Sequence, residues 1–154
     1  MKCSFVLILT FVSLFISSAL CCSKHDVNIN TENNTPMANG KIKIRVNSKI
    51  FTATLLDNNS AKGFREMLPL TINMSELNGN EKYYDLPSSM PNNSSNLRTI
   101  RNGDLMLYGS TTLVLFYKTF STSYSYTKLG SVDDGTGLET ALGSGSVIVS
   151  FELE

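Results

Sequence analysis

The sequence predicts a mainly β domain, either a closed β-barrel with helical caps or a sandwich. Three observations predict it. Apolar and polar residues alternate with a period of two over most of the chain after residue 40, turn signals recur at short intervals, and only two stretches have a helical pattern. About eight short strands joined by regular turns are typical of both all-β architectures.

The alternation is clearest in the first predicted hairpin. In "KIKIRVN", Ile42, Ile44 and Val46 point to one side and the polar residues between them point to the other. This pattern describes a strand with one buried face. Asn47-Ser48 then turns the chain into "KIFTATLL", where apolar residues alternate with threonines.

The later strands are marked by their turns. "TINMSEL" and "EKYYDL" flank Asn78-Gly79, and "LRTIR" and "DLMLYG" flank Asn102-Gly103. Both dipeptides are strong hairpin signals. The loop "SSMPNNSSN" separates the two pairs, and "TTLVLFYKTF" is apolar enough on both sides to be one central strand. "SVIVSFELE" supplies the last strand.

Two short helices are expected. "DNNSAKGFREMLP" opens with residues that cap helix N-termini and stops at Pro69, which cannot continue a helix. A second helix is predicted over Leu138 to Leu142, closed by Gly143.

Four segments in sequence order resemble the cyclophilin-like fold: "FTATLLDNNSAKGFREMLPLTINM", "ELNGNEKYYDLP", "GDLMLYGSTTLVLFYKTFSTSYSYTKLGSVDD" and "SGSVIVSFELE". The chain looks like the small bacterial cyclophilin-like domains and not like the true prolyl isomerases. The resemblance covers residues 41–154 and implies a closed eight-stranded barrel capped by two short helices. It implies fold much more than function, because the biochemical role of that family is poorly defined.

The residue types in the predicted domain exclude most catalytic mechanisms. From Lys41 onward there is no His and no Cys. A Ser-His-Asp triad, a Cys-His pair, a thiolate zinc site and an imidazole metal site are therefore unavailable. Acid-base chemistry by carboxylate, lysine or tyrosine side chains remains open, as does binding. With 13 basic and 13 acidic side chains, the chain offers no electrostatic case for nucleic acid. We expect a non-catalytic ligand- or protein-binding module without cofactor or metal.

The stretch "YKTFSTSYSYTKLG", from Tyr117 to Gly130, combines aromatic rings with hydroxyls. As a strand, it would place Phe120 and two tyrosines over the core and its serines in water. As a loop over the barrel mouth, it would contribute to a cleft that takes a small molecule, a glycan or a peptide. The candidate ligand-binding residues are Tyr83, Tyr84, Arg98, Arg101, Tyr117, Tyr124 and Tyr126.

The alternative function is a peptidyl-prolyl cis-trans isomerase that acts on envelope proteins. True cyclophilins use an arginine in an Arg-x-x-x-x-Phe-Met-x-Gln block, together with a tryptophan and a histidine. In "RTIRNGDLM", Arg98 and Arg101 lie near a strand, but Phe-Met-x-Gln is missing and the chain has no Trp. A protease-coupled assay on an X-Pro peptide separates the two functions, since a rate equal to the uncatalysed one removes the isomerase.

Residues 1–22 predict a secretory signal. Lys2 is followed by the apolar run "FVLILTFVSLFI" and then by Ser17, Ser18 and Ala19. The run is shorter than the roughly 20 apolar residues of a transmembrane anchor.

All three cysteines lie in this N-terminal segment, and Cys21 and Cys22 end it. Cleavage just before either one would leave a cysteine that can carry lipid, as in bacterial lipoproteins, whereas cleavage after the small residues would release a soluble protein. Free thiols suit an oxidising compartment poorly, which favours the lipid anchor. Residues 23–40 are too polar to form a core and predict a flexible tether. The expected location is the bacterial cell envelope, lipid-anchored or else periplasmic or secreted.

We expect intact-mass spectrometry of the mature protein to find an N-terminus at Cys21 or Cys22 with the added mass of lipid. Replacing both cysteines with serine should remove that mass. An unlipidated N-terminus just after Ala19 would establish soluble release instead, and an uncleaved N-terminus would contradict export altogether.

Overall fold

The computed structural model describes residues 35–154. The predicted signal, with Cys21 and Cys22, lies outside the described residues, as does most of the predicted tether. The first strand begins at Pro36, before Lys41, so the end of the predicted tether already belongs to the folded part.

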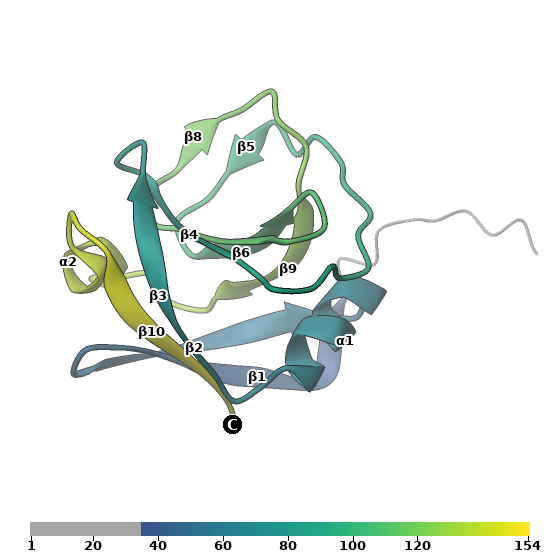
Figure 1. Ribbon diagram of the computed structural model, residues 1–154, viewed down its shortest axis with the longest axis horizontal. Coiled ribbons are helices and arrows are strands. Elements are labelled where there is room, and N and C mark those ends of the chain that lie inside the picture. Colours follow the sequence, from purple (N-terminus) through teal and green to yellow (C-terminus); the bar gives the residue numbers. More distant parts are fainter. Residues whose placement is uncertain (1–34) are drawn as a thin grey trace, which may run out of the picture. The chain divides into compact units, whose positions relative to one another are not determined.

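Eight antiparallel strands close into a barrel (Figure 1). They are β1 (Pro36–Val46), β2 (Lys49–Leu56), β3 (Leu70–Leu77), β4 (Glu81–Asp85), β6 (Asp104–Tyr108), β7 (Thr112–Phe116), β9 (Thr127–Val132) and β10 (Val147–Leu153). Around the barrel the order is β1-β10-β3-β4-β7-β6-β9-β2. This confirms the predicted closed barrel and excludes the sandwich.

The barrel interior follows from the period-two pattern. Ile42, Ile44 and Val46 from β1 are fully buried, and Phe151 from β10 pairs with Ile44 across the sheet. One core cluster joins these residues to apolar side chains of every other barrel strand. Burial of this apolar surface is the main stabilising contribution to the barrel.

Both predicted helices are confirmed. α1 spans Asn59–Glu66, and the side chain of Asn58 caps it by accepting a hydrogen bond from the Ala61 N–H at 2.8 Å. Its Phe64 is fully buried and meets Phe151 edge to face, with the ring centroids 5.5 Å apart. α2 spans Leu138–Leu142. The two helices lie on opposite sides of the barrel in Figure 1. Neither these nor any other helical segment in residues 35–154 is long and apolar enough to cross a membrane.

Two strand predictions were wrong. The predicted strand over residues 111–120 breaks after Phe116, and Phe120–Ser121 form a separate strand, β8. The segment before Asn102 does not form a hairpin with β6. It contributes only β5 (Thr99–Ile100), which pairs with β8 in a two-stranded ribbon beside the barrel (Figure 1).

The β5–β8 ribbon covers apolar side chains on the outer face of the barrel. This explains why the predicted strand breaks after Phe116 and why β5 does not pair with β6. β6 and β7 are buried on both faces, and Met106, Val114 and Phe116 form a second apolar cluster outside the barrel with Ile100 and Tyr126. The β5–β8 ribbon removes this apolar cluster from water, and such burial favours a chain that leaves β7 and returns over it.

A buried lysine links β3, β4 and the loop between α2 and β10. Lys82 of β4 is fully buried, and its ammonium pairs with Glu76 of β3. The same group donates hydrogen bonds to the carbonyl oxygens of Gly143 at 2.8 Å and Gly145 at 2.6 Å, in the loop between α2 and β10. The Tyr117 hydroxyl donates to the Glu76 carboxylate at 2.8 Å. Burial acts to raise the pKa of Glu76, but the hydrogen bonds from Lys82 and Tyr117 outweigh it and hold the pKa below its usual value.

We expect Lys82→Met to lower the free energy of unfolding by about 3–5 kcal/mol, because Glu76 loses its counter-charge inside the protein and two carbonyls lose their donor. Urea denaturation measures this loss. Lys62→Met is the matched control, since Lys62 pairs with Asp57 at 2.7 Å on the surface and should cost less than about 1 kcal/mol. Equal losses in the two variants would show that the buried ammonium contributes no special stability.

Candidate ligand-binding groove

A groove of about 530 Å³ lies on the outer face of the barrel, over β4, β6 and β7. One wall is β8 with the segment that follows it, and the other is the turn between β3 and β4. A volume of this size is typical of small-molecule sites. The groove is lined by Leu77, Asn78, Asn80, Glu81, Tyr83, Asp85, Tyr108, Thr112, Val114, Phe120, Ser121, Thr122, Ser123, Tyr124 and Tyr126.

Successive side chains of β4 point to opposite faces of the sheet, so only every second one reaches the groove. Glu81, Tyr83 and Asp85 share the outer face of the strand, while Lys82 and Tyr84 point into the barrel. Across the sheet, Tyr83 pairs with Val114, and Asp85 pairs with Thr112. The Thr112 hydroxyl donates a hydrogen bond to the Asp85 carboxylate at 2.7 Å, and this bond orients the Asp85 side chain.

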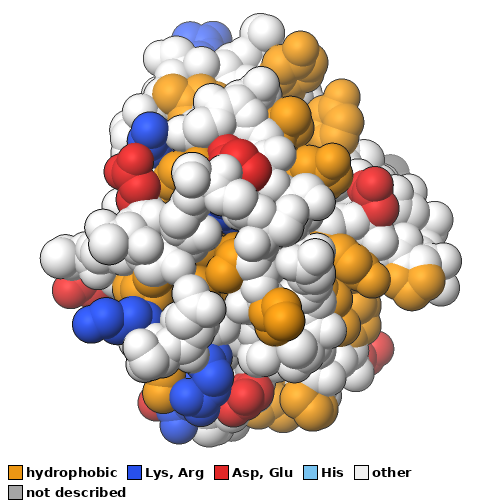
Figure 2. All heavy atoms as spheres, turned by 60° about the vertical axis from the view of Figure 1, so that its left-hand side comes forward, with side chains coloured by type: hydrophobic (Ala, Val, Ile, Leu, Met, Phe, Trp, Pro, Cys, Tyr) orange, Lys and Arg blue, Asp and Glu red, His pale blue; other side chains and the backbone are white. Residues whose placement is uncertain are grey.

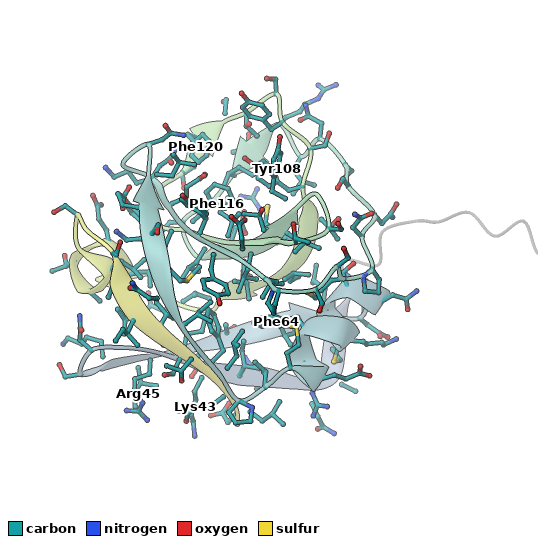
Figure 3. All side chains as sticks on the ribbon, in the orientation of Figure 1. Lys43, Arg45, Phe64, Tyr108, Phe116 and Phe120 are labelled. Carbon is teal, nitrogen blue, oxygen red and sulfur yellow. The ribbon has the colours of Figure 1, made fainter. Side chains whose placement is uncertain are left out.

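Aromatic rings form a continuous cluster along the groove. The Tyr108 ring lies 6.3 Å from that of Tyr124 and 5.5 Å from that of Tyr126, measured between centroids. Phe116 lies beneath them, 5.4 Å from Tyr126 and 5.6 Å from Phe120. Figure 3 shows Tyr108, Phe116 and Phe120 together in the half of the barrel away from Phe64. These geometries are edge-on or tilted, as aromatic quadrupoles prefer.

The stretch from Tyr117 to Gly130 was predicted to be either a strand or a loop over a cleft, and it contains both. Phe120 is a strand residue that packs on the outer cluster, but residues 122–126 form a loop. Backbone hydrogen bonds of 3.0 Å in both directions between Tyr126 and Ser95 anchor the end of this loop. Tyr126 is therefore buried, whereas Tyr124 remains 62% exposed at the rim of the groove.

The structure brings together three of the seven candidate residues, namely Tyr83, Tyr124 and Tyr126. Tyr84 follows Tyr83 by one position, so it points to the opposite side and packs on the barrel core. Tyr117 is buried against Glu76, as described above.

The two arginines lie outside the groove. Arg98 and Arg101 are both exposed, and Arg101 borders a different surface hollow beside Asp104 and Lys128. Sequence reasoning missed Tyr108, although its place at the end of "DLMLYG", next to an expected turn, was the available signal.

Glu81 is an unusual member of the groove. Only 7% of it is exposed, yet within residues 35–154 no hydrogen bond or ion pair reaches its carboxylate. Burial raises the pKa of Glu81 to about 7, and the negative charge of Glu76 adds to the effect. The neighbouring Asn80 side-chain oxygen is also buried without a hydrogen-bond donor. Burial raises the pKa of Tyr126 to about 12, with a further contribution from Glu81, so this hydroxyl stays neutral.

The groove lining contains two carboxylates and no lysine or arginine. In Figure 2 hydrophobic side chains gather in the upper part of the face next to an acidic side chain, while the larger basic group lies near its lower edge. Across the part of the chain that the structure describes, no three His, Cys, Asp or Glu side chains come together in a way that could hold a metal ion.

Comparison with known proteins agrees with this architecture. A family model described as "Cyclophilin-like family" matches residues 44–152, so the chain belongs to the cyclophilin-like family. The solution structure of the hypothetical protein AF2241 from Archaeoglobus fulgidus is similar, with a TM-score of 0.58 and 16% sequence identity. The match covers 80% of this chain and 99% of that one, and at this identity it concerns the fold alone. No curated protein matches the sequence.

We expect Glu81→Gln to stabilise the free protein at pH 8 and to change little at pH 4.5. A carboxyl group with a pKa of about 7 in the folded state, against an ordinary 4.5, is neutral in both states below pH 4.5. As the pH rises, the unfolded state ionises first, so the folded parent loses stability until its own group ionises near pH 7. The advantage of the variant should therefore grow between pH 4.5 and 7 and reach about 2–3 kcal/mol.

Urea denaturation at the two pH values measures this difference. Glu152→Gln is the control, because Glu152 is partly exposed on β10 and lies 3.9 Å from Arg45. An advantage of Glu81→Gln that is the same at both pH values would show that burial does not disfavour the Glu81 carboxylate.

Proposed function

We propose that this cyclophilin-like protein is an exported, non-catalytic binding module that takes a small molecule, glycan or peptide in the outer groove. The single observation that carries the proposal is the gathering of four of the chain's six tyrosines around one groove. Tyrosine rings stack on sugar or peptide surfaces and their hydroxyls form hydrogen bonds, at a small cost in side-chain entropy. The location at the cell envelope is part of the same proposal and rests on the N-terminal residues.

The chemistry of the groove supports binding over nucleophilic catalysis or prolyl isomerisation. Besides aromatic rings, its lining offers Ser, Thr and Asn side chains, which are adaptable hydrogen-bonding groups. No group among them is an imidazole or a thiol, and no arginine is available to donate to a prolyl nitrogen. The isomerase alternative stays a prediction that no feature of the groove favours.

The exposure of Tyr124 supports the same conclusion. An exposed aromatic side chain contributes little to the stability of a free protein, but it can become buried when a ligand covers it. Tyr124 stands at the rim, while the buried Tyr126 and the strands beneath it provide a fixed floor. This arrangement of a fixed floor and an exposed ring is suited to a ligand that lies between them.

Isothermal titration of the full chain against glycan and peptide libraries tests the proposal, and uniformly flat heats would count heavily against it. For a ligand found in this way, we expect Tyr124→Ala to weaken binding about 3- to 10-fold, since an aromatic contact is worth about 0.5–1.5 kcal/mol. The free energy of unfolding should change by less than about 0.5 kcal/mol.

Ile148→Ala is the matched control, because Ile148 is also 62% exposed but lies on β10, outside the groove. It should leave the affinity unchanged. A ligand that binds the parent and Tyr124→Ala equally well would show that it occupies some other surface.

A further inference from the structure

We propose that the groove recognises an alkylammonium group, which pairs with the Glu81 carboxylate. This inference rests on the proposed function and names the chemical class of the ligand. It follows from the unbalanced charge of the groove and from its aromatic walls.

Glu81 differs from the other buried charged residues in having no partner. Three charged residues are buried within residues 35–154: Glu81, Lys82 and Asp104. Lys82 has Glu76 and two carbonyls. Asp104 has the Lys128 ammonium at 2.6 Å and the Arg101 N–H at 2.8 Å. The fold thus satisfies two of its three buried charges and leaves the third facing a groove.

A buried carboxylate without a donor is costly, and folded proteins rarely keep one. A ligand cation would remove the cost by forming a charge-assisted hydrogen bond. The side-chain oxygen of Asn80, also buried without a donor beside Glu81, offers a second acceptor for the N–H groups of an ammonium. The Glu81 carboxylate in the groove lining and the buried Asn80 oxygen are both acceptors, so a ligand group that pairs with them is a donor.

The aromatic side chains favour the same class of ligand. Tyr126 lines the same groove as Glu81, and its ring forms one aromatic cluster with those of Tyr108 and Tyr124. Ring faces attract ammonium groups, and the effect increases when water is excluded. The methylene chain of an alkylammonium would meanwhile contact apolar ring surface.

The negative charge of the groove lining disfavours anionic ligands. Glu81 and Asp85 are acidic and no lysine or arginine lines the groove, so an anionic ligand would be repelled. Asp85 already accepts a hydrogen bond from Thr112 and is exposed, so it contributes a negative field to the groove. Glu81 is the group expected to make the direct contact.

The pH dependence provides a readout of Glu81 itself. The titratable groups that line the groove with Glu81 are Tyr83, Asp85, Tyr108, Tyr124 and Tyr126. Glu76 and Tyr117 lie behind the sheet and also interact electrostatically with Glu81. None of these groups carries a positive charge, and Lys82 points to the other side of the sheet. An alkylammonium keeps its charge between pH 5.5 and 8, so affinity should increase over this interval as Glu81, with its pKa of about 7, ionises.

The first experiment compares 1,5-diaminopentane with 1,5-pentanediol, which has nearly the same shape and no charge. Tyrosine fluorescence of the full chain reports binding, because the chain has no Trp and most of its tyrosines line the groove. We expect saturable binding of the diamine at pH 8 and binding at least 10-fold weaker for the diol. Equal binding of the two compounds, or binding of neither, would overturn the proposal.

The second experiment uses Glu81→Gln, with Glu152→Gln as a control for the loss of one negative charge elsewhere. Glu81→Gln should bind the diamine at least 10-fold more weakly than the parent at pH 8 and should lose the increase in affinity between pH 5.5 and 8. Glu152→Gln should behave as the parent does. If Glu81→Gln binds as the parent does while remaining folded, the ammonium is not held by Glu81 and the proposal is wrong.

A third experiment asks whether the ammonium belongs to a peptide side chain or to a free amine. Nα-acetyl-lysine methylamide presents the same group as a peptide side chain. Tighter binding of this compound indicates a basic peptide as ligand, and tighter binding of the diamine indicates a free amine; both outcomes support the ammonium site. If a neutral glycan or peptide binds through Tyr124 while neither amine binds, the groove is a binding site but this inference fails.

Discussion

The buried ammonium of Lys82 fixes the register of β4, and the groove depends on that register. Side chains alternate between the two faces of a strand, so a slip of one residue would bring Glu81 and Tyr83 into the barrel and expose Lys82. The acceptors of the ammonium come from β3 and from the loop before β10. Only one alignment of β4 satisfies all of them, and it is the alignment that places Glu81 and Tyr83 over the groove.

The groove also depends on a barrel that is apolar on part of its outside. Phe116 and Val114 lie on the outer face and need cover, which the β5–β8 ribbon and Tyr126 provide. The ribbon is short, and residues 122–126 continue as a loop. Where the cover ends, aromatic rings remain accessible beside the polar groups of β4, and a binding surface results.

Folding and binding place opposite demands on Glu81. In the free protein a buried carboxylate without a donor lowers stability, and a glutamine of the same shape would not have this cost. Residues that lower stability and contribute to no packing are often found where a protein contacts a ligand. The paired Lys82 and Asp104 show that the fold can satisfy buried charges elsewhere, so the isolation of Glu81 is specific to the groove.

The sequence by itself determined the class of fold. Alternation with a period of two, the Asn47-Ser48 and Asn78-Gly79 turns, and two capped helical stretches are local signals, because each depends on neighbouring residues along the chain. The absence of His and Cys after residue 40 likewise needs no structure to interpret.

The tertiary structure alone decided which residues form the groove. Period two separates Tyr83 from Tyr84, but it does not say which of the two faces the core. Tyr117 was expected beside Tyr124 and Tyr126, but it hydrogen-bonds Glu76 away from the groove, while Tyr108 was not expected and lies in the groove. The pairing of β5 with β8 in place of β6 was also inaccessible to sequence reasoning. Strand partners and buried faces are chosen by the total apolar surface that the whole chain removes from water, and no local pattern contains that quantity.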